Sequence, residues 1–157
     1  MAENLIFTEK EALFLKELLR EKVEFIIVGL SAAALQGAPV VTQDIDLWFK
    51  DLSDPGIKKA LKKCGAAYVP PSINNPPLFA GDAVKLFDIV VHMHGLGSFD
   101  DEKKHALAID LHGSTVLVLP LDRILTSKKA TGRRKDTLVL PVLRDALRAL
   151  KNTSSRR

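Results

Sequence analysis

Apolar residues recur at helical spacing near the start of the chain and again toward its end. Thr8 and Glu11 form a capping-box pattern ahead of the first such stretch, and Asp54 followed by Pro55 is typical of another helix start. Pro141 is expected either to kink the last helix or to mark its first turn. The helices predicted in this way span residues 8–21, 31–36, 55–64, 100–106, 120–130 and 136–150.

Short runs rich in β-branched and aromatic residues lie between these helices and predict strands. In Asp44–Phe49, acids alternate with large apolar residues, so the two sides of that strand differ in polarity. The turn residues Gly81 and Asp82 predict a hairpin of the runs on either side of them. The runs assigned as strands are 24–28, 44–49, 78–80, 83–93, 108–111 and 115–119, with a second hairpin between the last two. Because helices and strands intermix, the predicted fold class is α/β (α+β), with helices packed on a mixed central β-sheet.

Length and composition place the chain among globular proteins. With 157 residues, 46% of them hydrophobic, it is long enough for one domain with a substantial core. We expect that domain to cover residues 1–150 and the basic segment 151–157 to be a flexible tail. No apolar run reaches the roughly 20 residues of a membrane span, no secretory signal is visible, and a single Cys64 suits a reducing compartment. A cytoplasmic location is therefore expected.

Three aspartates carry the chemistry that the pattern predicts. Residues two apart in a strand project to the same side, so Asp44 and Asp46 lie together while Ile45 and Leu47 face the other side. Two close carboxylates repel each other unless a cation or a proton lies between them, and Mg²⁺ favours such oxygen ligands. Asp88 is a single acid in a strongly apolar run, where a buried carboxylate needs a partner. The simpler alternative is a pair that faces water on an edge strand.

A turn suited to binding an anion precedes the aspartate pair. The strand that ends at Val28 is followed by Gly29 and by a short helix that begins near Ser31. Free N–H groups and the positive end of the helix dipole at such a junction attract phosphate. An anion site, paired acids and a third acid on a later strand together predict a metal-dependent site for phosphoryl or nucleotidyl transfer.

The segment Val28–Leu47 resembles the signature of the nucleotidyltransferase superfamily related to DNA polymerase beta. In that signature an apolar residue and a glycine precede a short helix and an Asp-x-Asp strand. The segment Lys128–Asp136 is similar to a Lys…Arg-x-Lys-Asp segment of small bacterial members, including relatives of abortive-infection toxins. The resemblance implies a nucleotidyltransferase-like fold, with a mixed sheet and C-terminal helices.

The resemblance also implies roles for individual residues. Asp44, Asp46 and Asp88 would be the catalytic residues and would bind two Mg²⁺ or Mn²⁺ ions, which stabilise the attacking and leaving oxygens. The implied nucleotide-binding residues are Gly29, Ser31, Lys128 and Arg133. The partners would be a nucleoside triphosphate and a hydroxyl acceptor that is an RNA, a protein or a small molecule.

Three positions depart from the family pattern, namely Leu30, Val40 and Val139, which stands where related chains often have an Asp, and the first two keep other hypotheses open. Leu30 stands where the family has a second glycine or serine, and Val40 replaces a basic residue. These changes favour a catalytically inactive protein of the same fold that binds a protein partner in a toxin–antitoxin-like or regulatory pair. Nucleic-acid binding is a third hypothesis, and it rests on basic clusters alone because the net charge is only +4.

Other polar residues admit two interpretations. If the strand stays regular, His92 and His94 lie on the same side of it as Asp88. The two histidines could form a zinc pair. We expect instead that His92 is a hydrogen-bonding neighbour of the acidic site. The cations in the segment 128–135 either contact phosphate or cap and solubilise the junction of two helices. Asp136 suits the N-cap of the last helix.

Overall fold

The computed structural model of the chain describes residues 8–155, and the segments 1–7 and 156–157 lie outside the described part. The helices are α1 (Glu9–Arg20), α2 (Gly29–Leu35), α3 (Pro55–Lys63), α4 (Phe99–Lys103), α5 (Leu121–Thr131) and α6 (Arg134–Ser155), with one 3-10 turn, η1 (Asp82–Val84). The strands are β1 (Phe25–Val28), β2 (Ile45–Phe49), β3 (Ala67–Val69), β4 (Leu78–Ala80), β5 (Phe87–Val90), β6 (Leu107–Leu111) and β7 (Ser114–Val118). Strand β3 was not predicted.

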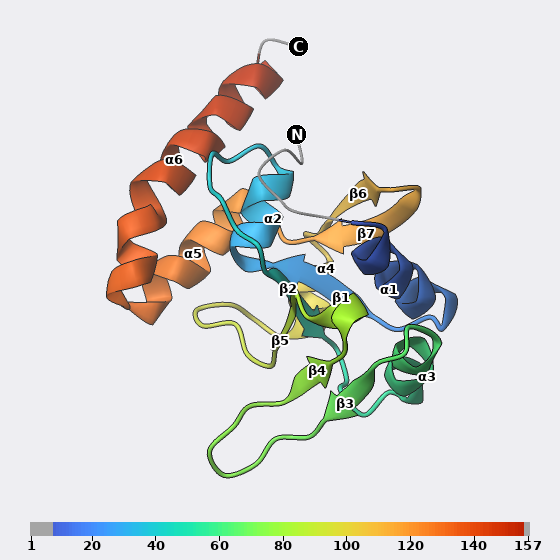
Figure 1. Cartoon of the computed structure of the whole chain (residues 1–157). Coiled ribbons are helices and arrows are strands. Elements are labelled where there is room, and N and C mark those ends of the chain that lie inside the picture. The colour runs from blue at the N-terminus through green and yellow to red at the C-terminus, as the bar shows by residue number, and fades with distance from the viewer. Residues whose placement is uncertain (1–7, 156–157) are drawn as a thin grey trace.

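A five-stranded mixed sheet in the order β5-β2-β1-β7-β6 forms the centre of the fold. Strand β1 pairs antiparallel with β2 and parallel with β7, and β2 pairs parallel with β5. In Figure 1, α1 and α3 lie to the right of this sheet and α2, α5 and α6 to its left. The predicted mixed sheet with helices packed on it is confirmed.

The two predicted hairpins have different outcomes. Strands β6 and β7 do form a hairpin, whose turn residues His112 and Gly113 both have positive φ. The hairpin predicted around Gly81 is wrong, because β4 pairs with β3 and β5 pairs with β2. Turn η1 redirects the chain after β4, and Phe87 of β5 then packs against Phe14 of α1, with ring centroids 5.0 Å apart.

The C-terminal part of the chain is two helices in contact, α5 and α6. Pro141 lies inside α6 instead of in its first turn, and the helix continues through Ser155. Residues 151–155 of the predicted flexible tail are therefore helical, and its last two residues lie outside the described part. Within residues 8–155, none of the helices combines the length and the apolarity of a membrane span.

The side chain of Gln36, at the end of α2, fastens this helix to the start of α5. Its Nε2 donates to the carbonyl oxygen of Leu119 at 2.8 Å, and its Oε1 accepts from the N–H of Leu121 at 3.0 Å. Both of these leucines are almost fully buried. The amide of one side chain thus satisfies two backbone groups that water does not reach.

Replacing Gln36 with Ala leaves those two backbone groups without these partners. A buried polar group that loses its partner retains its desolvation penalty, which lowers the free energy of unfolding. We expect the Gln36→Ala variant to be less stable by about 1–3 kcal/mol. The measurement is urea denaturation, with Gln43→Ala as the matched control because Gln43 is exposed. Equal midpoints for the two variants would contradict this role of Gln36.

Candidate active site

Three neighbouring strands place one residue each in a row on the same side of the sheet. Val28 of β1 is paired with Asp46 of β2, and Asp46 is paired with Asp88 of β5. Because directly paired residues project to the same face, the two carboxylates lie side by side. Phe14 of α1 and the aromatic rings around it pack against β4 and β5 on the other side, away from the two carboxylates.

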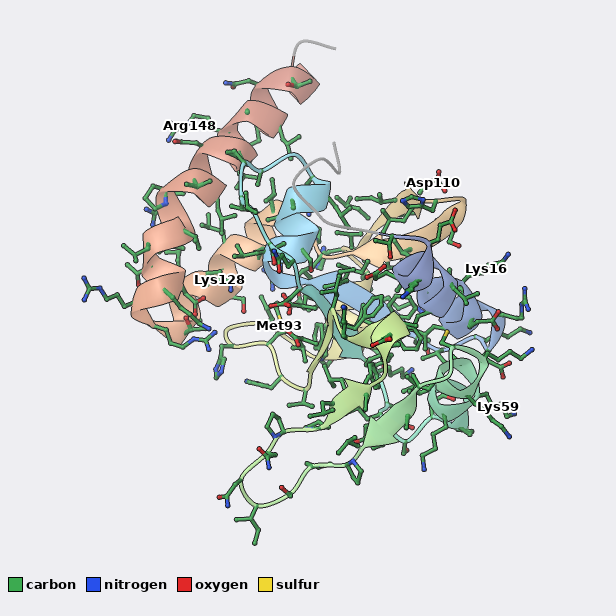
Figure 2. The ribbon with its side chains drawn as sticks, in the orientation of Figure 1. Lys16, Lys59, Met93, Asp110, Lys128 and Arg148 are labelled. Carbon is green, nitrogen blue, oxygen red and sulfur yellow. The ribbon has the colours of Figure 1, made fainter. Side chains whose placement is uncertain are left out.

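This row lies in a cleft of about 520 Å³ between the sheet and the C-terminal helices. Among the residues that line it are Asp44, Asp46, Asp88, Gly29, Lys128 and Arg133. The cleft therefore brings together every site residue predicted from the sequence except Ser31. Figure 2 labels two of its lining residues, Lys128 on α5 and Met93 in the segment after β5.

Gly29 gives the cleft its shape because it has no side chain. Its φ is +65°, and a Cβ built on it would lie 2.4 Å from Oδ2 of Asp46. Any other residue would therefore combine backbone strain with a clash against the carboxylate. The glycine lets the Asp46 carboxylate lie directly against the turn between β1 and α2.

Ser31 has a different place from the one predicted. It is fully buried, its hydroxyl donates to the carbonyl oxygen of Val28 at 2.7 Å, and its Oγ accepts from the N–H of Asp46 at 3.1 Å. Both bonds lie inside the protein, so the hydroxyl ties α2 to the strand that carries Asp46 and is not one of the groups lining the cleft. The sequence signal was a hydroxyl in the first turn of a helix, where a bond to the carbonyl three residues back is common.

Asp46 and Asp88, with Asp44 beside them, form an acidic row whose negative charge the protein compensates only in part. Burial, together with the neighbouring charge of Asp88, raises the pKa of Asp46 to about 7, although the charge of Lys128 acts in the opposite direction. Burial and the charge of Asp44 raise the pKa of Asp88 as well. A site with unneutralised carboxylates attracts a cation.

The chemistry of these ligands fits a hard divalent cation, although the site is not a closed cage. Among the side chains of the described part, no group of three or more His, Cys, Asp or Glu residues is positioned to hold a metal ion. Mg²⁺ binds through one or two carboxylates and takes its other ligands from water and substrate phosphates. Asp46 and Asp88, with Asp44 at the same cleft, supply carboxylates of that kind.

The opposite wall of the cleft is basic and has a buried acid at its centre. Asp136 is 2% exposed and accepts from Nζ of Lys128 at 3.0 Å, from Nε of Arg133 at 2.7 Å and from the hydroxyl of Thr131 at 2.6 Å. These bonds hold its pKa at about 2 although burial acts in the opposite direction. Asp136 lies inside the first turn of α6, so the predicted N-cap role is wrong.

Apolar and imidazole groups complete the lining. Leu30 and Val139 belong to it, and so do both histidines of the segment after β5. The rings of His92 and His94 meet edge to face, with centroids 4.8 Å apart. No third ligand joins them within residues 8–155, so the zinc alternative has no support, and His92 lines the same cleft as the acids.

Comparison with known proteins gives one kind of match. No protein-family model matches the chain, and no curated protein sequence matches it significantly. Solved structures, in contrast, match the chain. The crystal structure of ANT(2″)-Ia in complex with adenylyl-2″-tobramycin matches at a TM-score of 0.58 with 15% identity, over 91% of this chain and 90% of that one. The solution structure of the antibiotic-resistance factor ANT(2″)-Ia matches at a TM-score of 0.53 with 12% identity, over 95% and 97%. ANT(2″)-Ia is an aminoglycoside nucleotidyltransferase, and this chain has the nucleotidyltransferase fold.

Proposed function

We propose that the protein is a metal-dependent nucleotidyltransferase, which binds a nucleoside triphosphate with Mg²⁺ or Mn²⁺ and transfers its nucleoside monophosphate to a hydroxyl acceptor. The observation that carries this proposal is the row of Asp46 and Asp88 in a cleft whose opposite wall presents Lys128 and Arg133. The shared fold of a known nucleotidyltransferase supports it. An acidic side for a cation and a basic side for phosphates is the division that this reaction needs.

In this proposal each wall has its own task. Asp44, Asp46 and Asp88 would hold the divalent cation, which when bound neutralises charge on the attacking and leaving oxygens. Lys128 and Arg133 bind the phosphates that leave as pyrophosphate. The acceptor hydroxyl loses its proton to Asp88, and its oxygen forms the new bond to the α-phosphorus as the bond to pyrophosphate breaks. Asp88 suits this task because its side chain lines the cleft and its pKa is raised.

The acceptor is a separate question from the transfer. One structural neighbour was solved in complex with adenylyl-2″-tobramycin, so a small molecule bearing hydroxyl groups is one class to test. RNA and protein hydroxyls are the others. Incubation with each α-labelled nucleoside triphosphate, Mg²⁺ and each acceptor class, followed by separation of the labelled products, identifies both substrates.

A catalytically inactive binding protein is the second candidate, and the phosphate side of the cleft favours it. Leu30 faces the cleft where a small or hydroxyl-bearing residue would admit phosphate, and the hydroxyl of Ser31 is already engaged inside the protein. Calorimetry with ATP separates the two candidates. An enzyme gives heat that depends on Mg²⁺, whereas a protein that has lost the phosphate site gives none.

Removing one carboxylate from the acidic row should abolish transfer. We expect Asp88→Asn to lower the rate of labelled product formation by about 100-fold or more, because the charge that holds the cation and takes the proton is gone. Asp110→Asn is the matched control, since Asp110 is an exposed aspartate of the β6–β7 hairpin (Figure 2). Equal rates for both variants would rule out the proposed catalytic role of Asp88.

Adding a methyl group at Gly29 should disrupt the site specifically. The Gly29→Ala variant meets Oδ2 of Asp46 and carries strain at φ +65°, so we expect transfer to fall at least about tenfold, with a stability loss of about 1–2 kcal/mol. Gly65→Ala is the control for strain alone, because Gly65 has φ +69° and nothing within 4 Å of its added Cβ. Transfer by Gly29→Ala at the rate of Gly65→Ala would contradict the close-contact explanation.

The raised pKa of Asp46 predicts a pH-dependent stability. Since its pKa is about 7 in the folded protein and about 4 in an unfolded chain, its ionisation costs nothing below pH 4 and destabilises the fold increasingly up to pH 7. Asp46→Asn removes this cost, so its advantage in unfolding free energy should grow by roughly 2–4 kcal/mol between pH 5 and pH 8 without metal. Denaturant titrations at several pH values measure this, and an advantage independent of pH would disprove the assignment.

A further inference from the structure

Asp136 is a buried carboxylate whose partners all come from the cleft wall. Its two oxygens accept from Lys128, Thr131 and Arg133, and all three of these residues line the cleft. Burying a carboxylate is costly unless it is paired and hydrogen-bonded, and here two cations and a hydroxyl meet that requirement. The Asp136 carboxylate is therefore held by residues that line the cleft.

The junction between α5 and α6 depends on the same carboxylate. Lys128 and Thr131 belong to the last turn of α5, and Gly132 ends that helix in the left-handed conformation. Asp136 lies in the first turn of α6 and reaches back to both of them. One side chain thus links the two helices at their junction and holds the two cations there.

The bonds to Asp136 leave donors on both cations available for a ligand. Lys128 uses one of its three N–H groups on Oδ1, and Arg133 uses Nε on Oδ2, so its terminal amino groups are not needed for that bond. The side chain of Arg133 is 57% exposed and that of Lys128 is 19% exposed. Lys128 also lies close enough to Asp46 to lower its pKa, which places its ammonium group within the field of the acidic row.

We propose that Asp136 is a positioning residue, which holds Lys128 and Arg133 in the cleft before a nucleotide binds so that their remaining donors meet its phosphates. This inference rests on the proposed nucleotide-binding function. A free lysine side chain must lose rotational freedom when it binds a phosphate, whereas one already held by a carboxylate has lost it in the free protein. The single negative charge of Asp136 leaves one net positive charge on this trio, so attraction for phosphate is retained.

Asp136→Asn tests the proposal, with Asp145→Asn as the matched control. Asp145 is an exposed aspartate on the same helix, and it contacts Arg148 (Figure 2) at 3.6 Å. The first measurement is calorimetric titration with ATP and Mg²⁺. We expect Asp136→Asn to raise the dissociation constant about tenfold or more, because the negative charge that orients the two cations is lost and only one of the two acceptor oxygens remains. Asp145→Asn should bind as the unmodified protein does.

The second measurement needs no nucleotide. With lysines labelled at the ε-carbon, the NMR signal of Lys128, assigned with Lys128→Arg, should be separate from those of solvated lysines. It should move toward them in Asp136→Asn and stay in place in Asp145→Asn. An unmoved signal overturns the proposal, because Lys128 would then not depend on Asp136 for its position. Where the unmodified protein binds ATP, an unchanged dissociation constant in Asp136→Asn also overturns it.

The two measurements separate failure of this proposal from failure of the proposed function. If the unmodified protein gives no heat with ATP and Mg²⁺, nucleotide binding is refuted, and with it the phosphate-binding part of this inference, while the NMR signal still decides whether Asp136 holds Lys128. If Asp136→Asn does not fold, Asp136→Glu carries the test, because it keeps the charge but displaces the carboxylate. The Lys128 signal must then move and the dissociation constant rise, and two unchanged values overturn the proposal.

Discussion

The contact between the Asp46 carboxylate and the backbone of Gly29 is the constraint on which the rest of the cleft depends. Strand pairing places Asp46 between Val28 and Asp88, so its carboxylate has to lie beside the turn that follows β1. Only a residue without a Cβ leaves room there. The turn is one of the surfaces that cover the carboxylate, and burial is the largest cause of its raised pKa, with the charge of Asp88 next. The glycine therefore contributes to the electrostatics of the site as well as to its shape.

The acidic row could be predicted from the sequence because it depends on a simple periodicity. Strand alternation places Asp44 and Asp46 on one side, and the single acid in the next apolar run, Asp88, had to find a polar place on the same sheet. The fold class followed from the same patterns. Strand partners that depend on long-range packing did not follow, since Gly81 is compatible with a hairpin and with the turn that the structure contains.

The residues whose positions differ from the predicted ones share one property, which is that a short polar side chain near a helix start can bond in several directions. Ser31 could face a ligand or turn inward, and it turns inward to the N–H of Asp46. Asp136 could cap α6 or accept from side chains, and it accepts from Lys128 and Arg133. Local sequence does not decide between such bonds, because the choice depends on which groups the packed helices bring within reach.

The acidic and basic walls come from segments far apart in the sequence, and the short helix α2 connects them. At its start, Ser31 fixes the backbone of Asp46 on the acidic side. At its end, Gln36 fixes the beginning of α5, the helix that carries Lys128 on the basic side. A shift of α2 would therefore move both walls, and the distance between them depends on the buried Ser31 and the half-buried Gln36. In this fold two polar side chains at the ends of α2, which no ligand contacts in the proposed function, help to set the geometry of the charged groups that a nucleotide would contact.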